Sequence, residues 1–354
     1  MLDLVPLRGE VPLVPEERDE RIGPLHGAGG ELMGKLLTER VLPRFSRRSA
    51  GRIGLDRMDD GATLDLPPGE VVVTTDSHVV KPILFPGGDI GRLAAAGTLN
   101  DLAVMGARPV AMTLGLVLED GFPIDLLERI LDSLAATLDE VGCPLVAGDT
   151  KVMGKGELDG IVINTTGIGV AERAIGDADL SLGDRILVTG TIGDHGMALL
   201  AARPEYGLTT RLRSDVAPIW PLIERALAAG GVKAMKDPTR GGLAAALNEM
   251  ARKSGTTIEV CEAAIPVRDE AHALSAMLGI SPYEVANEGK AVLVVSPEKA
   301  EAVLAALRSH PLGREAALVG KVTAEYPRRV ILDTGVGGRR FLDMPLGDPV
   351  PRIC

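Results

Sequence analysis

The sequence predicts an α+β protein built of two α/β domains and a short C-terminal tail. Segments typical of strands and of helices are mixed in both halves, without the regular alternation of a doubly wound sheet. A chain of 354 residues is long for one hydrophobic core and sufficient for two. The polar segment 176–179 separates two apolar stretches. We therefore expect an N-terminal extension (1–22), a first domain (23–176), a second domain (177–345) and a tail (346–354).

Composition limits the classes of partner and compartment. With 45% hydrophobic but only 2% aromatic residues, the cores must consist mainly of Ala, Val, Leu and Ile. A net charge of −11 without a basic block argues against a nucleic-acid partner, although backbone N–H groups and single lysines still suit nucleotide phosphates. Three distant cysteines argue against a disulfide framework or a zinc site and are typical of a reducing compartment. No signal peptide opens the chain and no apolar run reaches about 18 residues, so we expect a cytoplasmic protein without a membrane span.

The first domain begins with a glycine cluster, His26-Gly27-Ala28-Gly29-Gly30, that leads into a periodic apolar stretch at 31–41. Such a loop before a helix lets backbone N–H groups approach an anion. A plain flexible loop explains the same residues equally well.

A β-branched run at 71–76 predicts a strand that ends on Asp76. Asp59 and Asp60 precede it in a turn, and three such carboxylates can converge on Mg²⁺. Turn chemistry alone also favours Asp59 and Asp60. Asp89, after a Pro-Gly-Gly stop, is a plausible N-cap for the next helix. Asn100 and Asp101 lie inside that helix, where these residue types are unfavourable, so we expect them to bind a ligand or a metal.

A strand at 110–118, an acidic helix at 124–141, and strands at 145–147 and 161–170 complete the first domain. Gly148-Asp149-Thr150-Lys151 is expected just past the end of the buried strand at 145–147, where α/β proteins place ligands. Lys151 there neutralises phosphate or, if desolvated, acts as a base.

The second domain opens with a strand at 185–190, and Gly193 to Gly196 cap the following helix. His195 in this cap is either a capping or phosphate contact or a catalyst. The charged, glycine-ended loop 236–242, with Asp237 and Arg240, is again of an anion-binding type. Asn287 and Glu288 precede a strand at 291–295, and a surface turn explains Glu288 equally well. The remaining expected elements are helices at 216–229, 240–254, 267–278 and 297–309, and strands at 318–322 and 330–333.

Cys354 is the last residue printed, and Pro349 and Pro351 make the segment before it extended. A thiol on a short stiff arm suits a nucleophile or a group carrier. A frayed end that stops at cysteine is the alternative.

Taken in order from His26 to Cys354, these motifs resemble the HypE family of hydrogenase maturation factors, which belongs to the PurM-like superfamily of aminoimidazole ribonucleotide synthetase. The resemblance implies two α/β domains, first domains that pair in a homodimer with ATP at the pairing, and a mobile tail. It also implies an activity. A carbamoyltransferase, HypF, places a carbamoyl group on Cys354, ATP drives its dehydration to a thiocyanate, and a HypC–HypD complex accepts the cyanide for the iron of [NiFe]-hydrogenases.

The resemblance also assigns roles to residues. It implies Cys354, Glu288 (as base) and Lys151 as catalytic. It implies a Mg²⁺ site formed by Asp76, Asp101 and Asp149, with Asp59 and Asp60. It implies nucleotide contacts from His26, Gly27, Gly29, Gly30, Asn100, Thr150, His195, Asp237, Arg240 and Asn287.

Other classes of function remain open from the residues alone. One is another enzyme of the superfamily, such as a thiamine-phosphate kinase or a selenophosphate synthetase. The latter would need a reactive Cys near the N-terminus, and no cysteine precedes Cys143. The other is a non-catalytic scaffold for a maturation complex.

Overall fold

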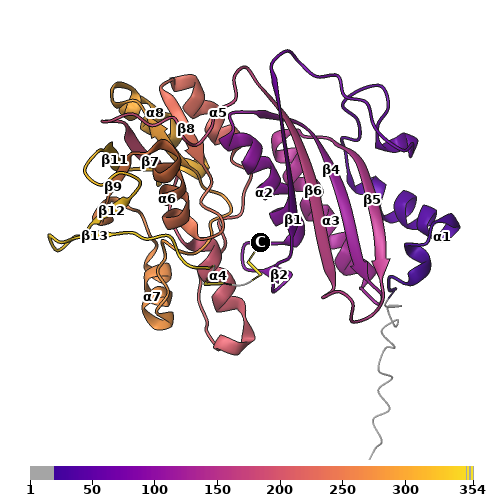
Figure 1. Ribbon diagram of the computed structural model, residues 1–354. Helices are drawn as coiled ribbons and strands as arrows, with labels where there is room; N and C mark the ends of the chain where they lie inside the picture. Colours follow the sequence, from indigo (N-terminus) through magenta and orange to yellow (C-terminus); the bar gives the residue numbers. More distant parts are fainter. Residues whose placement is uncertain (1–19, 348, 351, 354) are drawn as a thin grey trace, which may run out of the picture.

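The computed structural model describes residues 20–347, 349–350 and 352–353. Figure 1 shows two lobes side by side, one built on the sheet that contains β1, β4, β5 and β6, the other on the sheet that contains β7 to β13. Both lobes combine sheets with helices, so the predicted α+β class with two α/β units is confirmed. The boundary predicted between residues 176 and 177 lies in the segment that joins the two sheets and stays a prediction.

The first sheet has the order β1-β6-β4-β5, in which only β4 and β5 are parallel neighbours. Its strands are β1 (Glu70–His78), β4 (Arg108–Glu119), β5 (Leu145–Met153) and β6 (Ile161–Ala171). Helices α2 (Ile90–Val104) and α3 (Ile124–Val141) cover one face, which carries the buried residues of an alternating pattern in β6. The other face is open, and Val71 and Val73 are exposed on it. The short α1 (Gly30–Lys35) lies beside β5 in Figure 1, and the hairpin of β2 (Leu84–Phe85) and β3 (Gly88–Asp89) directly precedes α2.

The second sheet has seven strands in the order β13-β12-β9-β11-β7-β10-β8. The strands are β7 (Arg185–Val188), β8 (Val232–Lys236), β9 (Thr257–Cys261), β10 (Val292–Val295), β11 (Ala317–Thr323), β12 (Val330–Asp333) and β13 (Arg339–Phe341). The helices are α4 (Asp194–Ala202), α5 (Trp220–Ala229), α6 (Gly242–Ser254), α7 (Asp269–Leu278) and α8 (Ala300–Arg308). All four residues of β10 are buried, because its side chains alternate between a core with α6 and a core with α5 and α8. A continuous apolar run is what a strand covered on both faces requires.

Several local predictions are confirmed. The acidic helix predicted at 124–141 is α3, with the same bounds. Asp89 is the N-cap of α2 and accepts hydrogen bonds from the backbone N–H groups of Gly91 and Arg92. Other predictions need correction. The strand predicted at 145–147 continues to Met153, so Asp149, Thr150 and Lys151 lie inside β5 rather than past its end.

The two ends of the chain also differ from expectation. Most of the expected N-terminal extension, residues 1–19, lies outside the described residues. Ile22, which we assigned to that extension, is buried in the first core, and its backbone bonds Phe122 and Gly121. Of the tail, Val350 and Ile353 are buried, and the yellow end of the chain in Figure 1 runs between α4 and β2.

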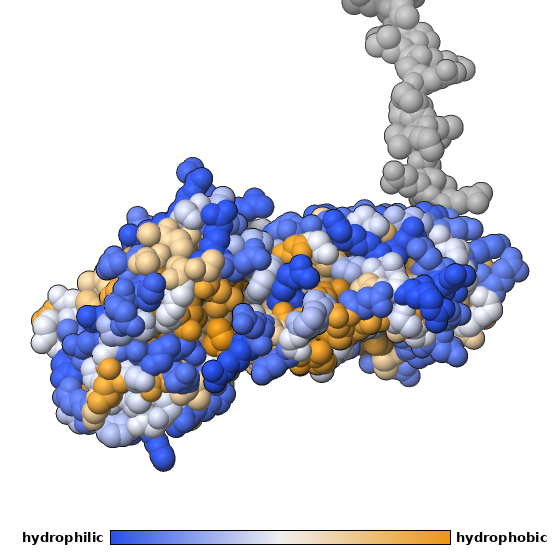
Figure 2. Space-filling model, turned by 90° about the horizontal axis from the view of Figure 1, so that it is seen from above, coloured by the Kyte–Doolittle hydropathy of each residue, from blue (hydrophilic) through white to orange (hydrophobic). Residues whose placement is uncertain are grey.

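The space-filling view from above shows two lobes joined at a narrower waist, with apolar patches scattered among charged side chains (Figure 2). Within the described part of the chain, no helix is long and apolar enough to cross a membrane.

Candidate functional site

The five predicted metal ligands, with some of the other predicted site residues, line two separate cavities. We call the first the cleft cluster: Asp76, His78, Asp101, Asp237, Arg240 and Glu288, which line one small cavity together with Ser77, Gly97 and Thr239. We call the second the sheet-edge cavity, where Asp59, Asp60, Asp149 and Thr150 meet an apolar wall.

Strand order explains why the five predicted metal ligands do not converge in one chain. Asp76 lies on β1 and Asp149 on β5, which are the opposite edges of the four-stranded sheet. The register places Asp76 opposite Thr165, then Leu114 and then Gly148, so three strand spacings of about 4.8 Å separate Asp76 from the residue beside Asp149. Asp76 and Asp149 of the same chain therefore do not bind one Mg²⁺ together, and the predicted metal site of Asp76, Asp101 and Asp149 stays a prediction.

The cleft cluster brings four carboxylates and one guanidinium to the lining of a single cavity. Asp76 comes from β1, Asp101 from α2, and Asp237 and Glu288 from two loops of the second lobe. The cavity volume is about 40 Å³, which holds a few water molecules or a group of a few atoms, but no nucleotide. A small group that entered it would meet carboxylates from both lobes.

Mutual repulsion and burial perturb these carboxylates strongly. Burial, then the charges of Asp237 and Asp76, raise the pKa of Asp101 to about 8. Burial also raises the pKa of Asp237. The pKa of Glu288 is raised well above its usual range, first by burial and then by the nearby Asp237 and Asp215. Such clusters of perturbed acids are typical of catalytic or cation-binding sites.

Glu288 is held by its backbone while its carboxylate points into the cluster. Its N–H donates to Asp215 Oδ1 (3.1 Å), and its carbonyl accepts from Asn100 Nδ2 (3.0 Å). Glu288 is only 3% exposed, and its Oε1 has no hydrogen-bond partner among the described residues. A buried carboxylate oxygen without a donor is costly, so this atom is placed for a group that the chain itself does not supply.

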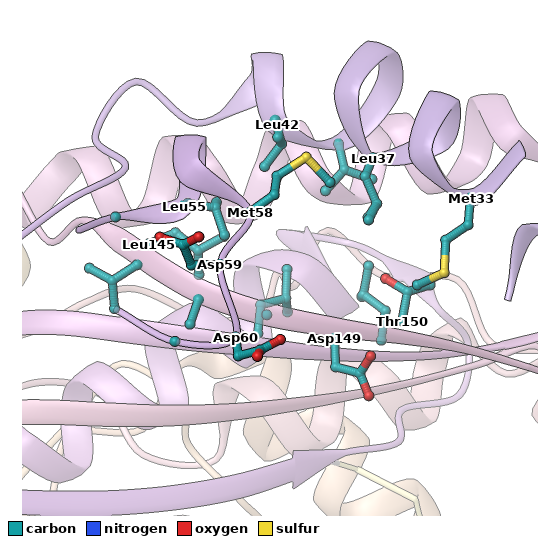
Figure 3. Close-up of a pocket in the computed structure, with 18 residues that line it drawn as sticks. Met33, Leu37, Leu42, Leu55, Met58, Asp59, Asp60, Leu145, Asp149 and Thr150 are labelled. Carbon is teal, nitrogen blue, oxygen red and sulfur yellow. The ribbon is translucent and has the colours of Figure 1, made fainter. Parts of the chain in front are cut away.

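The sheet-edge cavity has about 180 Å³ and is shown in Figure 3. Met33 of α1 and Met58 stand opposite the strand residues, and Leu37, Leu42 and Leu55 extend this apolar wall. Asp59 and Asp60 come from the loop after residue 57, and Asp149 and Thr150 from β5. A flat apolar slot with acids at its rim is suited to a nucleobase and to a cation that accompanies phosphates.

The donor sets of both groups fit Mg²⁺ in chemical type. Among the described residues, no three His, Cys, Asp or Glu side chains are arranged to hold a metal ion by themselves. Mg²⁺ usually binds through one or two carboxylates, with waters and substrate phosphates completing its shell, so a protein-only triad is not required.

Lys151 lies away from Glu288. The Lys151 side chain is 64% exposed, and its Nζ lies 3.4 Å from Asp149 Oδ2. Both residues lie on β5, the edge strand opposite β1 of the cleft cluster. Within one chain, Lys151 and Glu288 therefore lie apart, and the predicted catalytic role of Lys151 stays a prediction.

The glycines of the loop at the start of α1 are required for two different structural reasons. Gly27 packs so closely on β5 that a Cβ would lie 2.6 Å from the backbone nitrogen of Val152. Gly29 and Gly30 have φ of +81° and +80° and are exposed. The Nδ1 atom of His26 accepts a hydrogen bond from the N–H of Gly23 (2.9 Å). A phosphate contact for this loop stays a prediction.

The side-chain amides of two residues that were predicted to bind the nucleotide are fully used in hydrogen bonds within the protein. Asn100 donates to the carbonyls of Ala217 and Glu288 and accepts from the N–H of Ile219, so it ties α2 to the second lobe. Asn287 accepts from the N–H of Gly193 and donates to the carbonyl of Pro238. Both amides join segments of backbone in this structure, and their nucleotide role stays a prediction.

His195 contacts the tail. It is fully buried, its Nε2 lies 3.0 Å from the carbonyl oxygen of Ile353, and its Nδ1 lies 2.7 Å from Ser214 Oγ. Burial lowers its pKa, which favours the neutral ring. Ser214 Oγ already accepts from the N–H of Val216, so its proton is free to go to Nδ1 and Nε2–H donates to Ile353.

The end of the tail lies beside the segment that carries Glu288. A Cβ on Gly196 would touch both Val285 Cβ (2.5 Å) and Ile353 Cδ1 (3.2 Å), so Ile353 packs against the chain three residues before Glu288. Cys354 itself lies outside the described residues.

Sequence reasoning missed several residues of this region. His78 lies two residues after Asp76 on β1, hence on the same face, and strand alternation was a signal for it. Burial lowers its pKa to about 4. Asp215, which holds the Glu288 backbone and pairs with Lys290, comes from a loop with no local signal.

Two family descriptions match the two lobes. "AIR synthase related protein, N-terminal domain" matches residues 58–171, and "AIR synthase related protein, C-terminal domain" matches residues 182–333. The carbamoyl dehydratase HypE of Azotobacter vinelandii is 46% identical over 341 residues, which cover 95% of this chain and 98% of that protein. This chain belongs to the HypE family. A hydrogenase expression/formation protein of Methanocaldococcus jannaschii is 49% identical, over 94% of this chain and all of that protein.

Solved HypE structures have the same fold. The crystal structure of a HypE in complex with ATP superposes with a TM-score of 0.88 at 39% identity and covers 94% of this chain and 99% of that one. A HypE–HypF complex gives a TM-score of 0.76 at 42% identity, over 81% of this chain and 94% of that one. A thiamine-monophosphate kinase shares the fold alone, at 24% identity and a TM-score of 0.65.

Proposed function

We propose that this HypE-family protein is an ATP-dependent carbamoyl dehydratase that acts on its own C-terminal cysteine. The product is S-cyanocysteine, the source of the cyanide ligands of the [NiFe]-hydrogenase iron. The observation that carries the assignment to this chain is the docked tail: Ile353 packs against the segment that leads to Glu288, a buried carboxylate with an unpartnered oxygen.

The chemistry requires an oxygen to leave and two protons to be removed from one nitrogen. ATP, when bound, supplies the phosphoryl group that makes the carboxamide oxygen a leaving group, and phosphate leaves with the former carbonyl oxygen. Both N–H protons must go to bases before the carbon–nitrogen triple bond is complete. Glu288 is suited to accept one of them, because burial and its acidic neighbours make its carboxylate more basic than usual, and the departing phosphate can accept the other.

The remaining residues of the two cavities would bind the nucleotide and Mg²⁺. The sheet-edge cavity, with its apolar wall and the rim acids Asp60 and Asp149, is the proposed base and metal end of the nucleotide site. Asp76 and Asp101 would hold Mg²⁺ beside the reacting group, and Arg240 would face negative charge on the phosphates.

The separation of the two groups of residues favours a dimeric enzyme. We propose that two copies pair through the open face of the first sheet, where Val71 and Val73 are exposed. Lys151 and Asp149 at the sheet edge would then lie near the pairing. Sedimentation of the wild type against a Val71→Glu, Val73→Glu variant tests this, and a wild type that sediments as a monomer refutes it.

HypF is the proposed carbamoyl donor, since a HypE forms a solved complex with HypF, and a HypC–HypD complex is the proposed acceptor. The direct test of function is the intact mass after incubation with carbamoyl phosphate, ATP and HypF. The protein should gain one carbamoyl group at Cys354 and then lose one water. A chain that never gains the group, or gains it and never loses water, contradicts the proposal.

A further inference from the structure

A third cavity, separate from the two described above, has a volume of about 540 Å³. No step of the proposed reaction takes place in it. It borders the proposed base through one residue, Asp215, which lines this cavity and accepts the N–H of Glu288 on its Oδ1 (3.1 Å). We call it the arginine cavity, because its charged lining consists of Arg92, Arg211, Arg213, Arg268 and Lys290, with Asp194, Asp215, Glu270 and Glu315.

Lys290 supplies a buried ammonium group to this cavity. The residue is 8% exposed, and its stem packs so closely on Gly190 that a Cβ there would lie 2.9 Å from Lys290 Cε. Its Nζ lies 3.3 Å from Asp215 Oδ2, yet that oxygen has no hydrogen-bond partner among the described residues. Lys290 itself donates no hydrogen bond to a described residue. A buried ammonium group with three unused N–H donors requires oxygen atoms that the described chain does not supply.

Two arginines of the cavity carry positive charge that no described acid neutralises by direct contact. Arg211 and Arg213 are exposed, and neither forms an ion pair with a described residue. Arg268, by contrast, is held by Asp194 and Glu315, each at 3.0 Å. Two unpaired guanidinium groups and a buried ammonium group at one cavity are a donor set suited to the oxygens of a small oxyanion.

The buried carboxylates of the cavity restrict the kind of oxyanion. The side chains of Asp194 and Asp215 are 2% and 3% exposed, and each has one oxygen without a hydrogen-bond partner among the described residues. Such oxygens repel an anion that has no proton, and they favour an anion that brings an O–H donor. Phosphate carries at least one O–H near neutral pH, whereas sulfate carries none. The mixed lining therefore favours phosphate over sulfate.

We propose that the arginine cavity is a binding site for hydrogen phosphate. Lys290, Arg211 and Arg213 bind its charged oxygens, and its O–H donates to an unpartnered carboxylate oxygen. The site goes beyond the proposed function, because the binding of phosphate here requires neither a carbamoyl group nor the C-terminal cysteine. Since Asp215 contacts both Lys290 and the backbone of Glu288, bound phosphate lies one residue away from the proposed base.

Equilibrium dialysis of the full-length protein against radiolabelled phosphate near neutral pH tests the site directly. The measurement is repeated with a saturating non-hydrolysable ATP analogue and Mg²⁺, so that phosphate bound in the nucleotide site is displaced and only phosphate bound elsewhere is counted. We expect one phosphate per chain to remain bound with the analogue present. Unlabelled phosphate should displace it at concentrations at least about tenfold lower than sulfate, because only phosphate donates to a carboxylate.

Two variants locate the bound phosphate. The double variant Arg211→Gln, Arg213→Gln changes only exposed side chains, so it should fold normally, bind the ATP analogue as the wild type does, and bind phosphate at least about tenfold more weakly. Lys290→Met keeps the stem and removes the buried charge, and it should weaken phosphate binding further. Arg129→Gln, Arg173→Gln is the matched control, because it removes two exposed arginines that do not line the cavity, and it should bind phosphate as the wild type does.

Three results overturn the proposal. The first is a wild type that retains no phosphate once the ATP analogue is bound. The second is phosphate binding that neither the double variant nor Lys290→Met weakens, and the third is sulfate that competes as well as phosphate. The outcome does not depend on the proposed function: a protein that binds phosphate here and never dehydrates Cys354 refutes the dehydratase alone.

Discussion

Replacing Asp101 with asparagine tests whether the cleft cluster is electrostatically strained. Burial and the charges of Asp237 and Asp76 raise the pKa of Asp101 from 3.8 to about 8. The folded protein thus keeps a proton that the unfolded chain loses above pH 3.8, and the free energy of unfolding must fall as the pH rises towards 8. Asparagine has the same shape, carries no charge, and can still accept the hydrogen bond from Thr74 Oγ1.

The size of the effect follows from the pKa shift. Each pH unit between the two pKa values costs about 1.4 kcal/mol, so at pH 7 keeping Asp101 protonated in the folded protein costs at most about 4 kcal/mol. Asp237, whose own pKa is also raised, shares the repulsion with Asp101, which reduces the cost for one residue. We expect Asp101→Asn to raise the free energy of unfolding of the ligand-free protein at pH 7 by about 1–3 kcal/mol.

Thermal unfolding followed by circular dichroism between pH 6 and 8.5 measures this. The Tm of the wild type should fall across this range, and the Tm of Asp101→Asn should fall less and be higher by several degrees at pH 8. Added Mg²⁺ should raise the Tm of the wild type more than that of the variant. Asp179→Asn, at an exposed loop position, is the control and should follow the wild type.

The same substitution should slow the dehydration of carbamoylated Cys354 by orders of magnitude. The variant stays folded, but it lacks a carboxylate that would bind Mg²⁺. A variant whose Tm has the wild-type value and pH slope would refute the electrostatic reasoning. Dehydration at the normal rate would remove Asp101 from the mechanism.

Three further predictions concern the base, the lobe contact and the tail. Glu288→Gln should still accept a carbamoyl group on Cys354 but stall there, so that mass spectrometry shows the adduct accumulating; normal thiocyanate formation would exclude Glu288 as the base. Asn100→Ala should lower the free energy of unfolding by about 2–4 kcal/mol in urea titrations, since three buried backbone groups lose their partner. An unchanged stability would mean that Asn100 does not join the lobes. A few residues appended after Cys354 should leave ATP affinity near normal and block thiocyanate formation, because Ile353 lies in a closed site; a tagged protein that turns over at the normal rate would rule out the inserted tail.

The sequence determined the local elements whose signal lies within one segment. The acidic helix predicted at 124–141 matches α3 in its bounds, and Asp89 after a Pro-Gly-Gly stop defines the start of α2. The ordered motifs and the terminal cysteine were sufficient to identify the HypE family. Strands such as β8 and β9 were missed, because β8 carries Lys233 and Lys236 and β9 carries Glu259, so neither forms a continuous apolar run.

Only the tertiary structure decided which functional residues meet. Asp76 and Asp149 both lie on strands of the first sheet, but the order β1-β6-β4-β5 places them at opposite edges. Asn100 has the same disfavoured helix position as its neighbour Asp101, yet Asn100 faces backbone of the second lobe and Asp101 faces the cleft. His195 turned out to contact the tail. The physical reason is that periodicity and turn chemistry act over a few residues, whereas strand order, register and the packing of two lobes depend on contacts between residues far apart in the chain.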